Sequence, residues 1–347
     1  MKRTLIHNAT IVNEGQPTQG SVVIENGRIA EVLTNWKPLS APCEEVIDAT
    51  GCYLLPGIID DHVHFRDPGL THKADILTES SAAAAGGVTS IMDMPNTNPL
   101  TVTLDALNSK FDLLNEKCIV NHSCYFGATN DNYTEFDKLD KSRVCGIKLF
   151  MGSSTGNMLV DKMNSLLKIF NGTDMLIAAH CEDQEIIKAN IEIYKKKYKG
   201  TDDIPVNAHP GIRSVSACYA SSELAIRLAR IAGARLHILH VSTSKELKLF
   251  SNEPLEDKNI TSEACVAHLL YTLSHYNSLG ARIKCNPAIK RKTDREALRA
   301  AVNSGLIDVI ATDHAPHSPE EKAKGLKNSP MGVVGLETAF PVLYTGL

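Results

Sequence analysis

The chain has 347 residues, of which 43% are hydrophobic and 22% are charged, and its formal net charge is −4. A chain of this length buries roughly 75% of the surface that its unfolded form exposes, so the composition suffices for a large core. The small negative charge excludes the basic composition that is typical of proteins binding nucleic acid or anionic membranes.

Residues 1–52 alternate apolar and polar side chains, with turn residues between the runs. Asn26 and Gly27 lie between two of these runs and are a strong signal for a β-hairpin. The apolar runs are residues 4–6, 10–12, 21–24, 28–32 and 46–48. This pattern predicts a small β subdomain over residues 1–52.

From residue 53 onward, short apolar runs alternate with segments of helical periodicity. The predicted strands are residues 54–59, 90–94, 121–127, 146–151, 175–180, 236–241, 260–266 and 309–312. The predicted helices include residues 82–87, 104–117, 162–170, 184–199, 216–232 and 294–304. Eight strands with intervening helices predict an α/β fold, a (β/α)8 barrel of the TIM type over residues 53–347.

The first predicted barrel strand leads into a His-x-His pair, His62 and His64. Side chains two positions apart on a strand point to the same side, so both imidazoles can face one metal ion. The alternative is a pair of unrelated surface histidines beside a turn. The strand before the pair and the Arg-Asp-Pro-Gly sequence at residues 66–69 favour the metal site.

Polar residues also close later apolar runs. They are Asn96, Lys148, His180, His240 and Asp313. Because the carboxyl ends of the strands meet at one end of such a barrel, this pattern predicts a single active site. His237 competes with His240, but a spacing of three places them on opposite strand faces, and His240 closes the run. Asp313 can contact a metal and carry a proton, while its alternative role is a helix N-cap.

Lys148 lies in an apolar strand, at a place where a metal-bridging aspartate or glutamate is the usual ligand. A neutral lysine amine reacts with carbon dioxide to form a carbamate, which has carboxylate geometry and can bridge two metals roughly 3.5–4 Å apart. The alternative is a surface lysine whose stem covers apolar surface. The apolar neighbours of Lys148 favour the bridge.

The ordered set of motifs resembles the amidohydrolase superfamily with a binuclear zinc centre, and most closely the dihydroorotases. The matching motifs are PGIIDDHVHFRDPG (56–69), DMPNT (93–97), KLF (148–150), HCE (180–182), LHILHVST (236–243) and ATDHAPH (311–317). The resemblance covers essentially the whole chain, and Arg66 together with Asn96 narrows it to the dihydroorotases.

The resemblance implies reversible, zinc-dependent cyclisation of N-carbamoyl-L-aspartate to L-dihydroorotate in pyrimidine biosynthesis. The implied metal ligands are His62, His64 and Asp313 for one zinc, His180 and His240 for the other, and carboxylated Lys148 as the bridge. A hydroxide that bridges the metals would be the nucleophile, and Asp313 would be the general acid and base.

The free carboxylate of this substrate gives Arg66 a role, because a guanidinium can grip a carboxylate at two points. The resemblance implies further substrate contacts from Asn96, Asn286, His317 and main-chain groups of Met331 and Gly332. For Asn286, which precedes Pro287, the alternative is an ordinary turn.

The sequence departs from the family pattern at three places. Many bacterial dihydroorotases have a metal-bridging aspartate after the fourth strand, whereas residues 151–157 contain no acid here, which favours Lys148 as the bridge. Val215 and Ser216 replace acidic residues that often follow the arginine equivalent to Arg213. The chain also ends at Leu347, so we expect the C-terminal end to be missing and the β subdomain to lack its return strands.

Other functions remain as alternatives. Hydantoinases and dihydropyrimidinases act on rings without the carboxylate and carry a tyrosine soon after the bridging lysine, but none occurs between Lys148 and Asp161. Allantoinase also leaves Arg66 without a role. A non-catalytic scaffold that binds a transcarbamoylase would be expected to lose metal ligands, and every one is present.

The nine cysteines contain no Cys-x-x-Cys motif, and several lie in apolar runs, which is typical of reduced thiols in a cytoplasmic protein. The N-terminus has no signal-peptide pattern, and no run is long enough to span a membrane. We therefore expect a cytoplasmic enzyme with a small-molecule substrate, a homodimer, and association with a transcarbamoylase as a further option.

Overall fold

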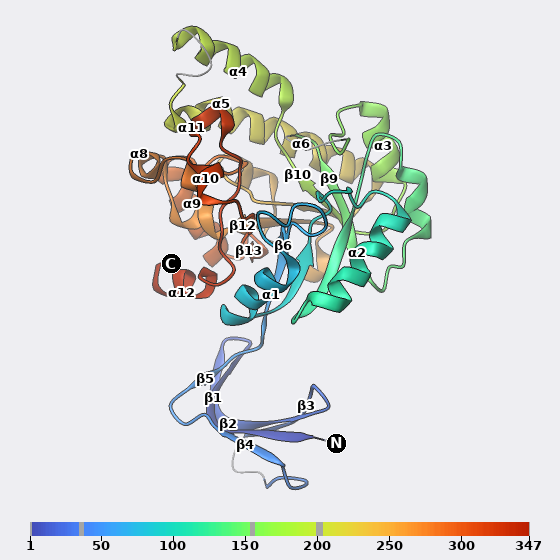
Figure 1. The fold of residues 1–347 in the computed structure, drawn as a ribbon, viewed down its shortest axis with the longest axis vertical. Helices are drawn as coiled ribbons and strands as arrows, with labels where there is room; N and C mark the ends of the chain where they lie inside the picture. The colour runs from blue at the N-terminus through green and yellow to red at the C-terminus, as the bar shows by residue number, and fades with distance from the viewer. Residues whose placement is uncertain (1, 35–37, 153–156, 199–203, 347) are drawn as a thin grey trace. The chain divides into compact units, whose positions relative to one another are not determined.

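The structure is a computed structural model that describes residues 2–34, 38–152, 157–198 and 204–346 (Figure 1). The chain divides into two units, residues 1–58 and 59–347. The division therefore falls later than the boundary expected after residue 52. The reason is that Tyr53 and Leu54 form a short strand, β5, which pairs in parallel with Thr10 and Ile11 of the first unit.

The first unit is a five-stranded sheet. Its strands are β1 (Arg3–Asn13), β2 (Gln16–Glu25), β3 (Arg28–Thr34), β4 (Glu45–Asp48) and β5 (Tyr53–Leu54). They lie in the order β3-β2-β1-β4, with β5 also on β1. The predicted hairpin at Asn26 and Gly27 is confirmed: both residues have positive φ, 52° and 74°, as the tight turn between two strands requires.

In its described residues, the second unit contains eight parallel strands, which confirms the predicted barrel fold. They are β6 (Ile58–Val63), β7 (Val88–Asp93), β8 (Asn121–Gly127), β9 (Val144–Phe150), β10 (Ile177–His180), β11 (Leu236–Ile238), β12 (Ile260–Cys265) and β13 (Val309–Ala311). The predicted first strand over residues 54–59 was wrong, because Leu54 pairs in the other sheet and Leu55 is exposed.

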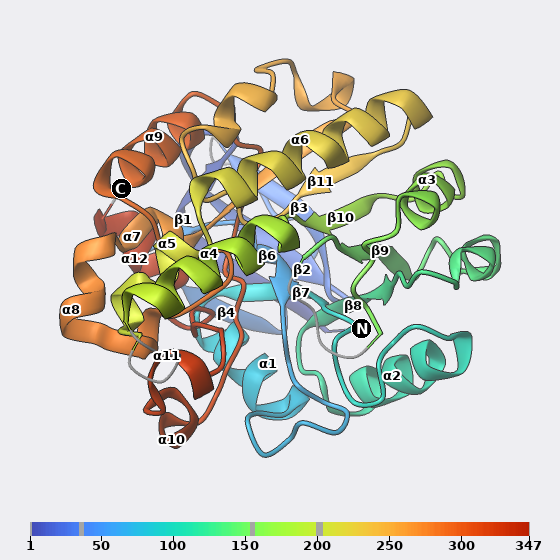
Figure 2. The ribbon, with the colours of Figure 1, turned by 90° about the horizontal axis from the view of Figure 1, so that it is seen from above.

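The helices lie around these strands (Figure 2). They are α1 (Ile76–Ala85), α2 (Leu104–Lys117), α3 (Met163–Asn171), α4 (Gln184–Lys197), α5 (His209–Ile212), α6 (Val215–Ala232), α7 (Val266–Leu270), α8 (Tyr276–Leu279), α9 (Lys292–Asn303), α10 (Pro319–Lys322), α11 (Gly325–Asn328) and α12 (Ala339–Gly346). Short 3-10 helices occur at Tyr133–Lys138, Val206–Ala208, Glu246–Leu249, Leu255–Asp257, Leu273–His275 and Gly280–Ile283.

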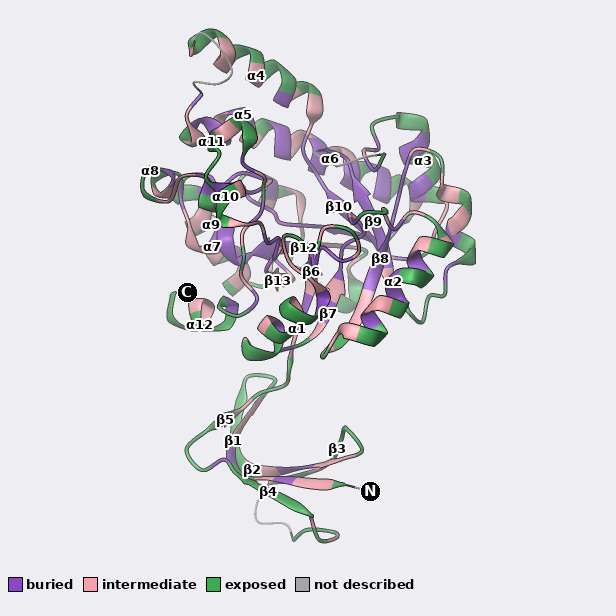
Figure 3. Cartoon of the chain, in the orientation of Figure 1, coloured by how far each residue is buried: buried purple, intermediate pink, exposed green. Residues whose placement is uncertain are grey.

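One predicted helix start was wrong, and one predicted helix end lies outside the described residues. Helix α1 begins before the predicted residue 82, because the Asp75 side chain caps it by accepting from the Thr78 amide. Helix α4 ends at Lys197 in the structure, and the predicted end at residue 199 lies outside the described residues. The barrel strands are largely buried while the outer helix faces are exposed, so the core of the second unit lies within and around the barrel (Figure 3).

The first and last strands of the barrel are joined by side chains as well as by main chain. The His64 amide donates to the His314 carbonyl at 2.8 Å, next to a bridge between Val63 and His314. The buried Asp60 carboxylate accepts from the amide and the hydroxyl of Thr312. This closure places the ends of β6 and β13, which carry predicted metal ligands, side by side.

Within the part of the chain that the structure describes, no helix is both long and apolar enough to cross a membrane. All nine cysteines lie in described segments, and each is a free thiol.

Candidate active site

A cavity of about 640 Å³ lies at the carboxyl ends of the barrel strands. Every predicted site residue lines it: His62, His64, Arg66, Asn96, Lys148, His180, His240, Asn286, Asp313, His317, Met331 and Gly332. A neighbouring cavity of about 830 Å³ shares Ala315, His317 and Gly332 with it but contains no predicted metal ligand. The polar residues therefore converge on the first cavity.

One cluster of ligand atoms consists of His62, His64 and Asp313. The Nε2 atoms of His62 and His64 each lie 3.2 Å from Asp313 Oδ1. The three ligand atoms lie within 4.8 Å of one another, which is the spacing of ligands around one ion. Burial raises the pKa of Asp313, but the nearby His62 and the hydrogen bond from His64 bring it below its ordinary value. The carboxylate is therefore ionised and ready to bind a cation.

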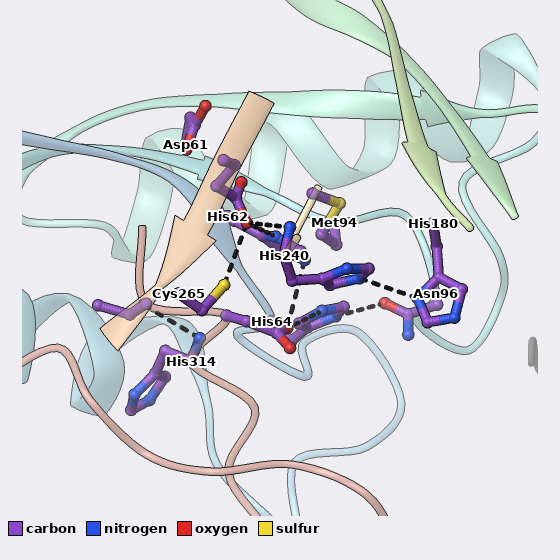
Figure 4. Close-up of polar contacts among 12 residues, drawn as sticks. Asp61, His62, His64, Met94, Asn96, His180, His240, Cys265 and His314 are labelled. Atoms are coloured by element: carbon purple, nitrogen blue, oxygen red, sulfur yellow. Dashed lines mark hydrogen bonds and ion pairs between the residues drawn. The ribbon is translucent and has the colours of Figure 1, made fainter. Parts of the chain in front are cut away.

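The second cluster consists of His180 and His240 (Figure 4). His180 Nδ1 and His240 Nε2 lie 2.9 Å apart, and the His240 ring centroid is 5.4 Å from that of His62. The Nε2 of His180 lies 2.9 Å from Glu182, which as a carboxylate only accepts, so Nδ1 of His180 presents a lone pair toward His240. Burial, with the charges of His180 and His62, lowers the pKa of His240 well below its usual range. The two imidazoles are neutral, and their facing nitrogens are close enough to bind one cation in place of the hydrogen bond between them.

The alternation of side chains along a strand does not explain the position of His240. Strand β11 ends at Ile238, and His240 follows it with a φ of 40°, so the alternation of faces does not extend to this residue. His237 instead lies inside the barrel, where its Nδ1 is 2.8 Å from the Thr261 hydroxyl. The predicted choice of His240 agrees with its position in the cavity, but the reason based on opposite faces was wrong.

A second layer of acceptors holds the other nitrogen of three of these histidines. The pairs are His62 Nδ1 with Glu263 at 3.0 Å, His64 Nδ1 with Asn96 at 2.7 Å, and His180 Nε2 with Glu182 at 2.9 Å. Such partners fix the tautomer and orientation of metal-binding histidines. The sequence analysis missed this role of Glu182 and Glu263. Two features of the sequence could have indicated this role: Glu182 follows His180 by two residues, and Glu263 lies inside an apolar strand.

Lys148 is only 1% exposed and lies in β9, next to the strand that ends in His180. Its Nζ lies 4.6 Å from the centroid of the Phe150 ring. Burial lowers the pKa of Lys148 to about 8, because an ammonium is poorly solvated in an apolar strand. Roughly one tenth of the amine is therefore neutral at pH 7, in the form that reacts with carbon dioxide, which is far more than for a lysine with the ordinary pKa. Of the acid-free segment 151–157, residues 153–156 lie outside the described residues.

Arg66 also lines this cavity. It is 7% exposed, its φ is 67°, and its Nε donates to the Pro316 carbonyl at 3.1 Å. Within the described residues, no carboxylate forms a salt bridge with it. Lys73 also lines the cavity, and its Nζ lies 3.1 Å from His317 Nδ1. The sequence analysis missed Lys73 because it lies in an irregular segment with no strand or helix to place it.

The main-chain conformation and the close packing at Gly332 require a glycine at this position. Its φ is 154°, and a Cβ built there would lie 2.2 Å from the Ala315 carbonyl oxygen. Its main chain can therefore approach the cavity lining more closely than any other residue could.

Comparison with known proteins identifies relatives over almost the whole chain. The amidohydrolase family profile matches residues 53–345. A dihydroorotase from Geobacillus kaustophilus is 34% identical over 338 residues, which is 96% of this chain and 76% of that protein. A dihydroorotase from Listeria innocua is 33% identical over 351 residues, 98% of this chain and 78% of that protein.

Among solved structures, the L-hydantoinase (dihydropyrimidinase) from Arthrobacter aurescens superposes with a TM-score of 0.89 and 26% identity. The match covers 100% of this chain and 78% of that chain. The fold is therefore shared with this L-hydantoinase, while the sequence is more similar to the two dihydroorotases. The chain belongs to the amidohydrolase family and, within it, to the dihydroorotases, which are enzymes that act on cyclic amides.

Proposed function

We propose that this protein catalyses the reversible cyclisation of N-carbamoyl-L-aspartate to L-dihydroorotate in pyrimidine biosynthesis, with two zinc ions per chain. The observation that carries the choice of substrate is the buried Arg66 in the cavity that also holds the histidine clusters. A buried charge needs a partner, and no carboxylate among the described residues forms a salt bridge with this one. The carboxylate of dihydroorotate would supply it, whereas a hydantoin or dihydrouracil ring would not.

The residues of the cavity fit a binuclear zinc centre. The proposed ligands are His62, His64 and Asp313 for one ion, His180 and His240 for the other, and carboxylated Lys148 between them. Imidazole and carboxylate are ligands that zinc accepts readily, and the facing nitrogens of His180 and His240 lie only 2.9 Å apart. When bound, two zinc ions would polarise the ring carbonyl and lower the pKa of a water molecule so that it can attack.

Asp313 is placed to move the proton in this reaction. It lies beside both histidines of the first cluster and is held ionised by them. For ring opening, its carboxylate would accept the proton of the attacking water and deliver it to the departing ring nitrogen. Ring closure would follow the reverse order, with Asp313 taking the proton from the carbamoyl nitrogen.

The remaining cavity residues would bind and orient the substrate. Arg66 would hold the carboxylate through paired hydrogen bonds. Asn96 would assist with its amide group, since its oxygen already accepts from His64. Asn286 and His317 would complete the polar contacts, and main-chain groups of Met331 and Gly332 would contact the edge of the ring.

Activity on two kinds of ring tests the proposal. Purified, zinc-loaded protein should hydrolyse L-dihydroorotate and cyclise N-carbamoyl-L-aspartate, both followed by ultraviolet absorbance. Dihydrouracil and hydantoin serve as controls that lack the carboxylate. Faster turnover of either control than of dihydroorotate would overturn the proposed substrate.

Location and assembly stay predictions from the sequence. The nine free thiols agree with the expected cytoplasmic location, where cysteines are kept reduced. Light scattering of the purified chain, alone and mixed with a transcarbamoylase, would test the homodimer and the association.

A further inference from the structure

His317 lies between two cationic side chains at the wall of the cavity. Its Nε2 is 3.0 Å from Arg66 Nη2, and its Nδ1 is 3.1 Å from Lys73 Nζ. Guanidinium and ammonium groups only donate hydrogen bonds. A neutral imidazole has one N–H and one lone pair, so it can accept from only one of the two cations.

A third contact decides which nitrogen carries the proton. The Met331 carbonyl oxygen lies 3.0 Å from His317 Nε2 and can only accept. A proton on Nε2 lets His317 donate to Met331 and accept from Lys73 at Nδ1. A proton on Nδ1 would instead face the Lys73 ammonium and leave the Met331 carbonyl opposite a lone pair. Burial, and then the charges of Arg66 and Lys73, lower the pKa of His317 to about 3, so the doubly protonated ring is disfavoured as well.

Lys73 is itself held in place across the mouth of the cavity. Its Nζ lies 3.3 Å from Glu321 Oε1, and both side chains are largely buried, at 15% and 23% exposure. Glu321 belongs to α10 and accepts from the Ser318 amide, so the contact joins the segment after β6 to the segment after β13. The other Glu321 oxygen is 3.6 Å from His317 Nδ1, too far for a hydrogen bond that would compete with Lys73.

The Nε2-protonated ring has a consequence for Arg66. With Nε2 protonated and donating to Met331, the Arg66 Nη2 group, 3.0 Å from that nitrogen, finds no lone pair on His317. Its N–H therefore stays available to an anionic acceptor, such as a carboxylate oxygen. Both residues line the same cavity as the histidine clusters.

We propose that Lys73 is a positioning residue that holds His317 as the neutral, Nε2-protonated tautomer, so that His317 does not accept from Arg66 and the Arg66 guanidinium stays free to donate to the substrate carboxylate. The substrate in this statement rests on the proposed function. The tautomer does not, because it follows from contacts within the chain.

The test compares Lys73→Met with the native enzyme, both loaded with zinc and labelled with 15N at histidine. Methionine keeps the length and apolar stem of lysine but removes the ammonium. The ring-nitrogen NMR signals of His317, assigned by their loss in His317→Asn, should show a proton on Nε2 alone in the native protein. In Lys73→Met, both tautomers should be populated. The KM for dihydroorotate should rise roughly tenfold, as expected for losing a hydrogen bond to a charged group, while kcat changes less than KM.

Two further variants separate positioning from loss of fold. Lys73→Arg keeps a cationic donor and should restore the single tautomer and most of the affinity. Lys138→Met removes an exposed lysine paired with Glu135 and should change neither readout. Unchanged zinc content and unchanged signals from the other histidines would show that Lys73→Met is folded.

The inference is overturned if the native His317 carries its proton on Nδ1, or if Lys73→Met keeps both the Nε2 tautomer and the native KM. Absence of dihydroorotate turnover in the native enzyme would refute the proposed function instead. The NMR signals would still decide the role of Lys73 in that case.

Discussion

At the scale of single residues, Arg66 and Lys148 show how burial turns a common side chain into a functional group. Lysines and arginines are rarely buried without a partner, because the charged form loses its hydration. Arg66 keeps its charge and lines a cavity, whereas burial lowers the pKa of Lys148 to about 8. One residue is therefore suited to bind an anion and the other to react as a neutral amine.

Replacing Arg66 tests the choice of substrate. Arg66→Ala should lower kcat/KM for dihydroorotate by about one and a half to three and a half decades, because losing one member of a desolvated charge pair costs roughly 2–5 kcal/mol. Zinc content, measured by atomic emission, should be unchanged, and slow hydrolysis of dihydrouracil should be little affected. An equal loss of activity toward both substrates would show that Arg66 has a structural role.

Replacing Lys148 tests the metal bridge. Lys148→Ala should retain less than two zinc ions per chain and lose activity, since no other side chain in the described strand replaces the carbamate. Short carboxylic acids added to this variant should restore part of both zinc content and activity by occupying the vacated space. Exposed Lys168 provides the matched control, and Lys168→Ala should behave as the native protein does. An active, fully loaded Lys148→Ala enzyme would contradict the assignment.

At the scale of elements, the segment after β13 is held over the cavity by two buried lysines. Lys322 Nζ donates to the carbonyls of Lys284, Pro330 and Gly332, at 3.0, 3.1 and 2.8 Å. Lys284 Nζ in turn donates to the carbonyls of Leu326 and Ser329. These contacts fix the main chain around Gly332, which the proposed function places at the substrate ring.

The pH dependence of KM tests this arrangement. Burial lowers the pKa of Lys322 to about 8, so its third donor is present below that pH and is lost as the pH rises through it. KM for dihydroorotate should therefore rise above pH 8. Lys322→Met should have a KM about tenfold higher at pH 7, since leaving buried carbonyls unpaired costs roughly 1–3 kcal/mol.

The variant should also show a smaller rise with pH, because Lys284 alone remains to titrate, and its pKa is likewise lowered to about 8 by burial. Exposed Lys324 lies in the same segment, and Lys324→Met is the control that should keep the native profile. If the KM of the native enzyme does not change between pH 7 and 9.5, the third N–H of the Lys322 ammonium does not hold the segment after β13.

At the scale of the whole molecule, the proposed ligands come from five strands and the turns that follow them, so metal binding should contribute to the stability of the barrel. Anything that binds only the folded state stabilises it, by about 4.1 kcal/mol for a ligand at 1,000 times its Kd. A chelator should abolish activity and lower Tm, and zinc should restore both. His62→Ala should lose metal and activity together and should not respond to zinc. A metal-free protein with full activity would exclude the binuclear centre.

Much of the fold was predictable because the signals are local. Strand β8 and helix α2 have the predicted bounds, since each is a run of one periodicity between clear ends. The first barrel strand was misplaced because residues 53–59 form one apolar run that the structure divides between two sheets. Hydropathy records that a residue prefers burial but does not record which sheet will bury it.

The sequence by itself determined which polar residues follow the barrel strands. The ordered motifs indicated the amidohydrolase superfamily, and Arg66 with Asn96 narrowed it to the dihydroorotases. Only the tertiary structure decided the partners of these residues. Glu263 holds His62 across 201 positions, and Lys73 meets His317 across 244. The physical reason is that such contacts depend on the closure of the barrel, which brings distant strand ends to one cavity, and no local pattern of residues encodes that distance.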